Sequence, residues 1–366
     1  MKELEEIIDL QNNRGVPEQL GLKLITGRRI IVHDGTFREI ISTENLFTAW
    51  EEFKSGKRSR EDVLEFELHL EDNIFAIYEE LKSECKRQIR YEQFHITDPK
   101  PRIINKASVS ERIVHQAIYQ VLMPIFDKTF IFDSYSCRKE KGTHKGFKRL
   151  VELARKQSKN YSSPCWALKC DIRKFFHSID HKILIELLSH RIADEKLMKL
   201  LTEIIESFAV SPGKGMPLGN LTSQLFANIY LDPMDKFVKH KLKARYYLRY
   251  ADDFMFLADN RDVLEVNLAD VGLFLNERLK LSLHPNKCIF RKLNWGLDFV
   301  GYVTHPKFNL PRKKTVQRMF AKLEKIQANH PDKLNESLQS YLGYLKHVNS
   351  RELSMEVLVR FDSANK

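Results

Sequence analysis

Two apolar stretches joined by Tyr250-Ala-Asp-Asp253 constrain the fold of this 366-residue chain more than any other feature. Residues 244–258 are rich in aromatic and aliphatic side chains on both sides of the acid pair, which predicts an antiparallel hairpin with the acids at its tip. Adjacent carboxylates repel each other, and tight hairpin turns usually use Asn-Gly or Asp-Gly. The pair therefore indicates either a solvated turn or a site for a cation that removes the repulsion.

A third acid ends another predicted strand. Residues 165–171, Cys-Trp-Ala-Leu-Lys-Cys-Asp, are typical of a buried strand that ends in Asp171. Phosphoryl transfer by two metal ions needs carboxylates from separate strands, converging on ions roughly 3.5–4 Å apart. Asp171, Asp252 and Asp253 are therefore the candidate catalytic residues and metal ligands.

The charge balance favours a polyanionic partner. Lys and Arg total 60 against 49 Asp and Glu, a formal charge of +11, and each phosphate that binds a cation releases a counterion. A basic surface without such a partner is the alternative. Five cysteines without C-x-x-C spacing predict neither a zinc ribbon nor disulfides. The acidic first residues do not resemble a signal peptide, and no apolar run approaches the roughly 20 residues of a membrane helix. We therefore expect a cytoplasmic protein that does not contact a membrane.

Helical periodicity covers much of the remaining chain. Helices are predicted over 44–90, 110–126, 182–191 and 221–239, with Asp180 as an N-cap and two amphipathic helices after residue 312. Short β-prone stretches lie at 29–33 and around Ile103. The apolar stripes of the last two helices are interpreted as packing faces.

Further motifs accompany the carboxylates. Asp171-Ile-x-x-Phe-Phe176 and Tyr250-Ala-Asp-Asp253 resemble the A and C motifs of reverse transcriptases. Six more segments resemble other motifs of that family in the right order: Lys100-Pro-Arg102, Glu111-Arg-Ile-Val114, 134–144, 218–224, Pro285-Asn-Lys287 and Phe299-Val-Gly-Tyr302. The resemblance covers about residues 44–348. It implies an α+β, right-hand polymerase fold with fingers, a palm of antiparallel sheet plus helices, and a small helical thumb.

The resemblance also implies a division of the chain. We expect an N-terminal extension at 1–43, fingers with part of the palm at 44–165, the palm at 166–305 and a helical thumb at 306–366. The extension matches no motif and is interpreted as an extra fingers element or an RNA-binding arm. The segment after Tyr302 is too short for an RNase H or endonuclease domain.

Site residues follow from the same resemblance. Two Mg²⁺ ions, with Mn²⁺ as a substitute, would be held by Asp171, Ile172, Asp252 and Asp253. The expected nucleotide-binding residues are Lys100, Arg102, Phe176, Gln224 and Lys287. The expected nucleic-acid-binding residues are Arg138, Tyr250, Gly301, Tyr302, Arg312 and Lys313.

Four of these residues have a specific expected role and a simpler alternative. The ring of Phe176 would lie under the sugar and exclude a 2′-hydroxyl, and the alternative is core packing. Lys287 would protonate the leaving pyrophosphate, and the alternative is a surface lysine. Lys100 with Arg102 would bind the triphosphate, and the alternative is a solvated basic loop.

The expected function is RNA-directed DNA synthesis on a structured noncoding RNA in a bacterium, with a DNA or RNA primer and deoxynucleoside triphosphates. Leu218-Gly219 and Ser223-Gln224 resemble the enzymes of diversity-generating retroelements and of antiphage defence. An accessory protein or a second copy of the chain is a further expected partner. Two alternatives stay open: template-independent or protein-primed DNA synthesis, and a non-catalytic nucleic-acid-binding relic, which would be expected to lack one of the three acids.

Overall fold

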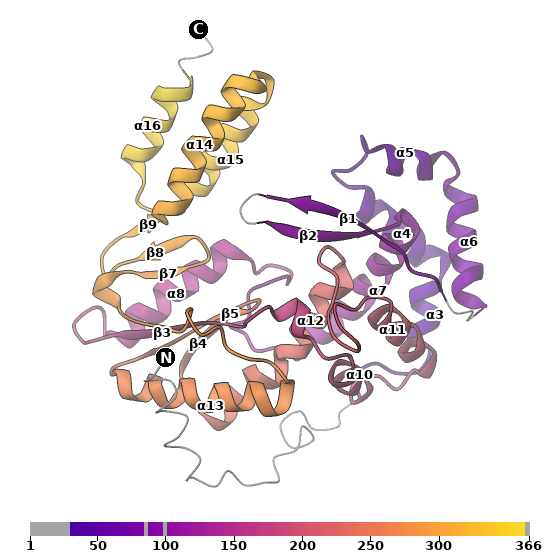
Figure 1. Ribbon diagram of the computed structural model, residues 1–366, viewed down its shortest axis with the longest axis horizontal. Coiled ribbons are helices and arrows are strands. Elements are labelled where there is room, and N and C mark those ends of the chain that lie inside the picture. Colours follow the sequence, from indigo (N-terminus) through magenta and orange to yellow (C-terminus); the bar gives the residue numbers. More distant parts are fainter. Residues whose placement is uncertain (1–29, 84–86, 98–100, 363–366) are drawn as a thin grey trace. The chain divides into compact units, whose positions relative to one another are not determined.

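The computed structural model describes residues 30–83, 87–97 and 101–362 (Figure 1). The chain forms two compact units, each assembled from three separate stretches. The first comprises 1–132, 172–243 and 269–285, and the second comprises 133–171, 244–268 and 286–366. These units do not coincide with the four segments expected from the sequence, and that functional division stays a prediction.

Helix α7 (Val109–Asp127) is central to the first unit. It contacts α3 (Thr36–Ile41), α4 (Thr43–Lys54), α5 (Glu61–Leu68) and α6 (Leu70–Lys82). The apolar positions Leu46, Trp50 and Phe53 of α4 are buried, as their helical spacing requires. The predicted helical stretch 44–90 is thus confirmed over α4 to α6, with breaks at residues 55–60 and at His69.

The rest of the first unit supplies a two-stranded ribbon and more helices. β1 (Tyr91–Ile96) and β2 (Arg102–Ala107) pair antiparallel. The helices are α9 (Phe175–Ser178), α10 (His181–Ser189), α11 (Glu195–Glu206) and α12 (Leu221–Lys236), and α12 continues as a π-helical turn, η1 (Phe237–Lys241). α12 contacts both α7 and α10. The predicted N-cap is confirmed, because the Asp180 carboxylate accepts from the N–H groups of Lys182 and Ile183.

A four-stranded antiparallel sheet organises the second unit. Its order is β4 (Tyr246–Tyr250), β5 (Asp253–Ala258), β3 (Trp166–Asp171) and β6 (Ile289–Lys292). Side chains alternate between its faces. Ala167 and Leu257 lie on the same face of the sheet as Asp171, the last residue of β3. Both belong to a hydrophobic core that includes Leu150 and Leu153 of α8 (Thr143–Gln157). That core covers one end of the face.

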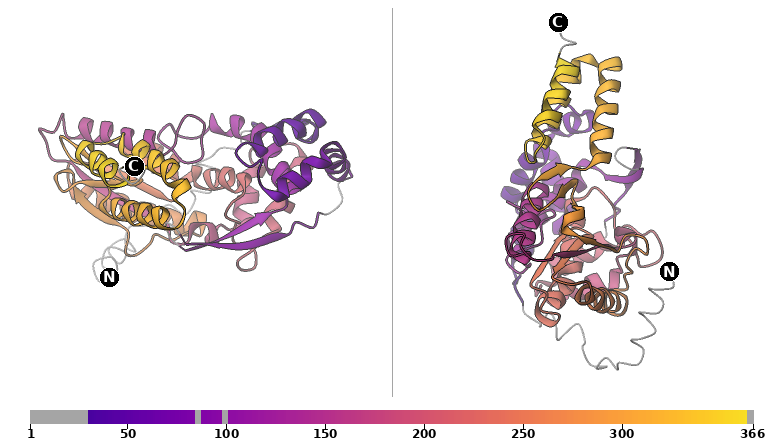
Figure 2. Two further views of the ribbon diagram at one scale, coloured as in Figure 1. Left: turned by 90° about the horizontal axis from the view of Figure 1, so that it is seen from above. Right: turned by 90° about the vertical axis from the view of Figure 1, so that its left-hand side faces the viewer.

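Two smaller elements complete the second unit. A three-stranded sheet contains β7 (Leu297–Phe299), β8 (Tyr302–Thr304) and β9 (Asn309–Pro311), and the turn η2 (Leu293–Trp295) precedes it. The helices α14 (Lys313–Asn329), α15 (Leu334–Leu345) and α16 (Arg351–Asp362) pack together around Met319, Leu323 and Leu338, with the turn η3 (Pro331–Lys333) between the first two (Figure 2). Helix α13 (Arg261–Leu279) begins in the second unit and ends in the first.

The α+β class expected from the sequence is confirmed. The β-prone stretch 29–33 is different: Arg29 lies outside the described residues, and Val32 makes only an isolated bridge with Ile192. Among the described residues, no helix combines the length and the apolar character needed to cross a membrane.

Candidate active site

The three predicted catalytic acids lie together at one end of the four-stranded sheet, where β3 ends and β5 begins. Asp171, the last residue of β3, lies directly opposite Asp253, the first residue of β5. Tyr250 also lies opposite Asp253 across the β4–β5 pair, so Ala251 and Asp252 form a two-residue turn. The strand end and the hairpin tip predicted from sequence thus lie side by side.

The hairpin turn has an uncommon backbone. Ala251 adopts φ +54°, in the left-handed region where a side chain is disfavoured by about 1–2 kcal/mol. Both tight two-residue hairpin turns, types I′ and II′, require a positive φ at the first central position, where glycine or asparagine is usual. Alanine here means that surrounding contacts hold the turn.

Burial and mutual repulsion act on the acid pair. Removal from water raises the pKa of Asp252 to about 6, and the charges of Asp253 and Asp171 act in the same direction. The pKa of Asp253 is also raised, first by burial, against the opposing effect of Lys169 and Lys287. A cation bound between these oxygens would reverse both shifts.

Lys287 already places one positive charge at this site. Its Nζ donates to both carboxylate oxygens of Asp171, each at 2.9 Å. The β3–β6 register pairs Lys169 with Ile289, and continuing it by two residues sets Lys287 opposite Asp171. The position of Lys287 beside Asp171 is therefore a consequence of strand pairing, whereas its role toward the nucleotide stays a prediction.

The donor set suits a hard divalent cation, although its side chains do not form a closed metal centre. Within residues 30–83, 87–97 and 101–362, no three His, Cys, Asp or Glu side chains are arranged to enclose an ion. Both oxygens of Asp171 face Lys287 instead. The chemistry nevertheless fits, because three crowded carboxylates offer the oxygen ligands that Mg²⁺ prefers and need a positive partner.

Most of the nucleotide-binding residues predicted from sequence lie in the first unit. Arg102 is exposed at the start of β2, and Lys100 lies outside the described residues. Phe176 on α9 is half-buried, and its ring packs edge to face against that of Phe175, with the ring centroids 5.4 Å apart. Gln224 is half-buried in the first turn of α12. The predicted metal ligand Ile172 is buried, and its backbone bridges to Leu283.

The turn before α12 contacts β2. The N–H of Asn105 donates to the carbonyl of Leu218 at 3.2 Å. Gly219 has φ +122°, and a β-carbon on it would lie 3.2 Å from Cγ2 of Ile104. Glycine at this position therefore provides both the backbone conformation and the close approach to the strand.

A second tight hairpin joins β7 to β8. Phe299 pairs with Tyr302, and the two residues between them, Val300 and Gly301, have φ +45° and +97°. The carbonyl of Gly301 accepts from the hydroxyl of Tyr344 at 2.6 Å and from the N–H of Arg312 at 2.9 Å. The α15 helix thus holds the tip of this hairpin.

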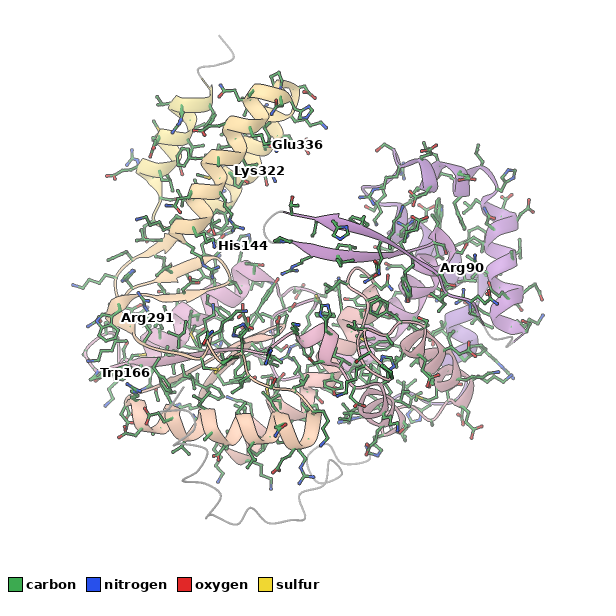
Figure 3. The ribbon with its side chains drawn as sticks, in the orientation of Figure 1. Arg90, His144, Trp166, Arg291, Lys322 and Glu336 are labelled. Carbon is green, nitrogen blue, oxygen red and sulfur yellow. The ribbon has the colours of Figure 1, made fainter. Side chains whose placement is uncertain are left out.

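Tyr302 lies in the core. Its ring is fully buried and stacks on Tyr344 with centroids 4.6 Å apart. Its hydroxyl donates to the Tyr344 carbonyl at 3.1 Å and shares a 3.0 Å hydrogen bond with Nδ1 of His144, which Figure 3 labels. The ring has a packing role, so the predicted contact of this residue with nucleic acid could involve only its backbone.

The other predicted nucleic-acid-binding residues also belong to the second unit. Nη1 of Arg138 donates to the Ser134 carbonyl at 2.9 Å. The Tyr250 hydroxyl shares a 3.2 Å hydrogen bond with Thr143. Arg312, the N-cap of α14, pairs with Asp298. Lys313 is exposed at the first position of α14.

Sequence reasoning missed the residues that hold the turns. Arg249 is fully buried in β4, and Nη1 of its guanidinium donates to the Ala251 carbonyl at 3.1 Å. Tyr344 is a second example. An arginine in the apolar run Tyr246–Tyr250 was the available signal for Arg249, whereas nothing local marks Tyr344.

Comparisons with known proteins agree with the geometry. Residues 95–304 match the family model described as reverse transcriptase (RNA-dependent DNA polymerase). Protein YkfC of Escherichia coli (strain K12) is 25% identical over 241 residues, covering 56% of this chain and 63% of that protein. Group II intron-encoded protein LtrA of Lactococcus lactis subsp. cremoris is 23% identical over 271 residues, covering 56% of this chain and 44% of that protein.

The chain spans less than two thirds of the length of these curated relatives. Among solved structures, the apo telomerase of Candida tropicalis, truncated from the C-terminal domain, aligns with a TM-score of 0.44 and 15% identity. That alignment covers 60% of this chain and 54% of the telomerase chain.

Proposed function

The chain belongs to the reverse transcriptase family, and from this premise we propose that it is an RNA-directed DNA polymerase in which Asp171, Asp252 and Asp253 hold two Mg²⁺ ions. The observation that carries the proposal is the register that sets Asp171 opposite Asp253 and Asp252 in the adjoining turn. Acids on two neighbouring strand ends are the arrangement that two-metal nucleotidyl transfer requires.

The acids and Lys287 divide the work at this end of the sheet. When bound, the ions would supply activation of the primer 3′-hydroxyl and stabilisation of the leaving pyrophosphate, and Mn²⁺ would serve in place of Mg²⁺. The main-chain carbonyl of Ile172 would add a further oxygen ligand. Lys287 neutralises Asp171 through its two hydrogen bonds, and it is the proposed proton donor to the leaving group.

Residues of the first unit are proposed to bind the incoming nucleotide. Lys100 and Arg102 would pair with its triphosphate, Gln224 would contact the base pair being formed, and Phe176 would exclude a 2′-hydroxyl. For the nucleic acid, we propose contacts with Arg138, Tyr250, the Gly301 turn, Arg312 and Lys313.

The test is incorporation of deoxynucleotides on an RNA template with a DNA primer. Asp252→Ala with Asp253→Ala should abolish incorporation, whereas Asp259→Ala with Asp262→Ala, which removes two exposed acids after β5, should leave it unchanged. Wild-type incorporation by the Asp252/Asp253 variant would reject the proposed site. Incorporation that needs no RNA template would favour template-independent or protein-primed synthesis.

The biological role is a narrower proposal. Leu218-Gly219 and Ser223-Gln224 at the start of α12 support action on a structured noncoding RNA in a bacterial diversity-generating retroelement or an antiphage defence system. Sequencing the RNA that co-purifies with the chain, and any DNA attached to it, tests this role. A product copied from a repeat beside a variable gene would favour the retroelement, and intron RNA in place of either template would reject both.

A further inference from the structure

Arg249 is an unusual residue for the interior of a sheet. Its side chain is fully buried, and a buried guanidinium is tolerated only where hydrogen bonds replace its hydration. Its backbone is fixed on both edges of β4. Arg249 lies opposite Phe254 of β5, its N–H donates to the Asp133 carbonyl, and its own carbonyl accepts from Tyr135, both at 2.9 Å.

The guanidinium lies on the face of the sheet opposite the carboxylates. Cross-strand partners share a face, so Asp171 and Asp253 are on one side while Arg249 and Phe254 are on the other. Phe254 belongs there to an aromatic cluster with Tyr247 and Phe256. Arg249 therefore supports the site from behind.

Its contact with the site passes through the backbone of the turn. Nη1 of Arg249 donates to the carbonyl of Ala251 at 3.1 Å. That carbonyl and the N–H of Asp252 belong to the same peptide bond. Ala251 is also the residue with the disfavoured φ of +54°. A charge-assisted hydrogen bond from a rigid strand fixes this peptide plane in its disfavoured conformation.

We propose that Arg249 is a positioning residue for the cation site, holding the Ala251–Asp252 peptide so that Asp252 and Asp253 both face Asp171. The inference rests on the proposed function of the three acids. Without this hydrogen bond, the turn would relax toward a negative φ at Ala251, and repulsion between the carboxylates would separate them.

The test measures Mn²⁺ binding to the full chain by electron paramagnetic resonance, together with thermal unfolding in the absence of metal. Arg249→Met keeps the length of the apolar part and removes the donor. Loss of a group that orients a metal ligand typically weakens metal affinity about 10–100-fold, and we expect a rise in Kd within that range. Arg249→Gln, which keeps an amide donor on a shorter side chain, is measured beside it and serves alone if Arg249→Met does not fold.

The control is Arg149→Met. Arg149 also supports β4 through residues 133–135, because it pairs with Asp133 at 2.7 Å, and it forms a second ion pair with Glu152 of α8. This variant should lower the melting temperature and leave the Kd for Mn²⁺ unchanged. A wild-type Kd in a folded Arg249 variant overturns the positioning role. Absence of Mn²⁺ binding by the wild-type chain would instead reject the proposed metal site.

Discussion

At the scale of single residues, the three acids lie at one site, but their charges are stabilised to very different extents. Asp171 is paired with Lys287 through both oxygens, whereas burial and neighbouring charges raise the pKa of Asp252 to about 6. The negative charge of Asp171 is thus already balanced by Lys287, and Asp252 is the acid that a cation would stabilise most. This difference follows from which strand lies beside each carboxylate.

The residue-scale prediction concerns Phe176. Phe176→Ala should increase incorporation of ribonucleotides relative to deoxynucleotides by roughly tenfold to a hundredfold, because a pocket that loses its steric wall loses about 1–3 kcal/mol of discrimination. The measurement is kcat/KM for each nucleotide on the same primer and RNA template. Phe175→Leu is the matched control: Phe175 is fully buried beside it, so that change should reduce stability without altering sugar selection. Unaltered selection by Phe176→Ala would show that its ring only packs.

Much of this site follows from sequence because its signals are local. Asp171 ends an apolar run, and Asp252 and Asp253 interrupt another, so strand prediction alone brings them to strand ends. Arg249 and Tyr344 are different, because each donates a hydrogen bond to the backbone carbonyl of a turn residue. Such a contact depends on the conformation of the turn and on the position of the side chain in the folded chain, and neither can be read from the sequence pattern. For Tyr302, the motif predicted a contact with nucleic acid but not the burial of the ring, and that contact stays a prediction.

At the scale of elements, the contact between α7 and α12 contains a buried histidine. The ring of His115 is completely buried and shares a 2.9 Å hydrogen bond with the hydroxyl of Thr222. Burial lowers its pKa to about 3 from an ordinary value of 6.5, and Arg87 contributes in the same direction. Between pH 6.5 and about 3, the ring of His115 is therefore neutral in the folded protein and protonated in the unfolded chain.

The element-scale prediction follows from that depressed pKa. Above pH 6.5 the contribution of His115 to stability is fully present, and it declines as pH falls from 6.5 toward 3, by about 1.4 kcal/mol per pH unit. His115→Gln should flatten the pH dependence of the free energy of unfolding in that window. Urea unfolding between pH 4.5 and 7 measures the difference, and equal slopes for the variant and wild type would contradict it.

Element boundaries were predictable where capping and periodicity agree. Asp180 caps α10, and the stripe with Met319 and Leu323 faces the core of the α14–α16 helices. The strands β7 to β9 were not predicted, because each has only three residues. Strands this short leave no periodicity to detect, and long-range pairing defines them instead.

At the scale of the whole molecule, the charge of +11 is the property most relevant to binding. It is concentrated in the second unit, which carries 28 Lys and Arg against 16 Asp and Glu, whereas the first unit carries 32 against 33. Within the second unit, α14 exposes Lys313, Lys314 and Lys322, the last labelled in Figure 3. Such a distribution favours contact with phosphates and makes affinity depend on salt, because binding releases counterions.

The whole-molecule prediction is a linear fall of the logarithm of RNA affinity with the logarithm of salt concentration. Lys313→Ala should reduce the magnitude of that slope by about one, as expected for the loss of one phosphate contact. Fluorescence anisotropy with a labelled primer–template between 50 and 200 mM salt provides the measurement. Lys182→Ala, on the exposed side of α10, is the control and should leave the slope unchanged. Affinity independent of salt would contradict a phosphate-dominated interface.

The opposition of Asp171 and Asp253 also determines where this chain can change length. Because consecutive strand residues point to opposite faces, deleting one residue between Ala167 and Cys170 would send one member of every later pair to the wrong side. The two-residue turn at Ala251 leaves equally little space for an insertion. Evolution can therefore lengthen or shorten the chain at turns such as Pro331–Lys333, between α14 and α15, while the spacing within 166–171 and 246–258 remains fixed.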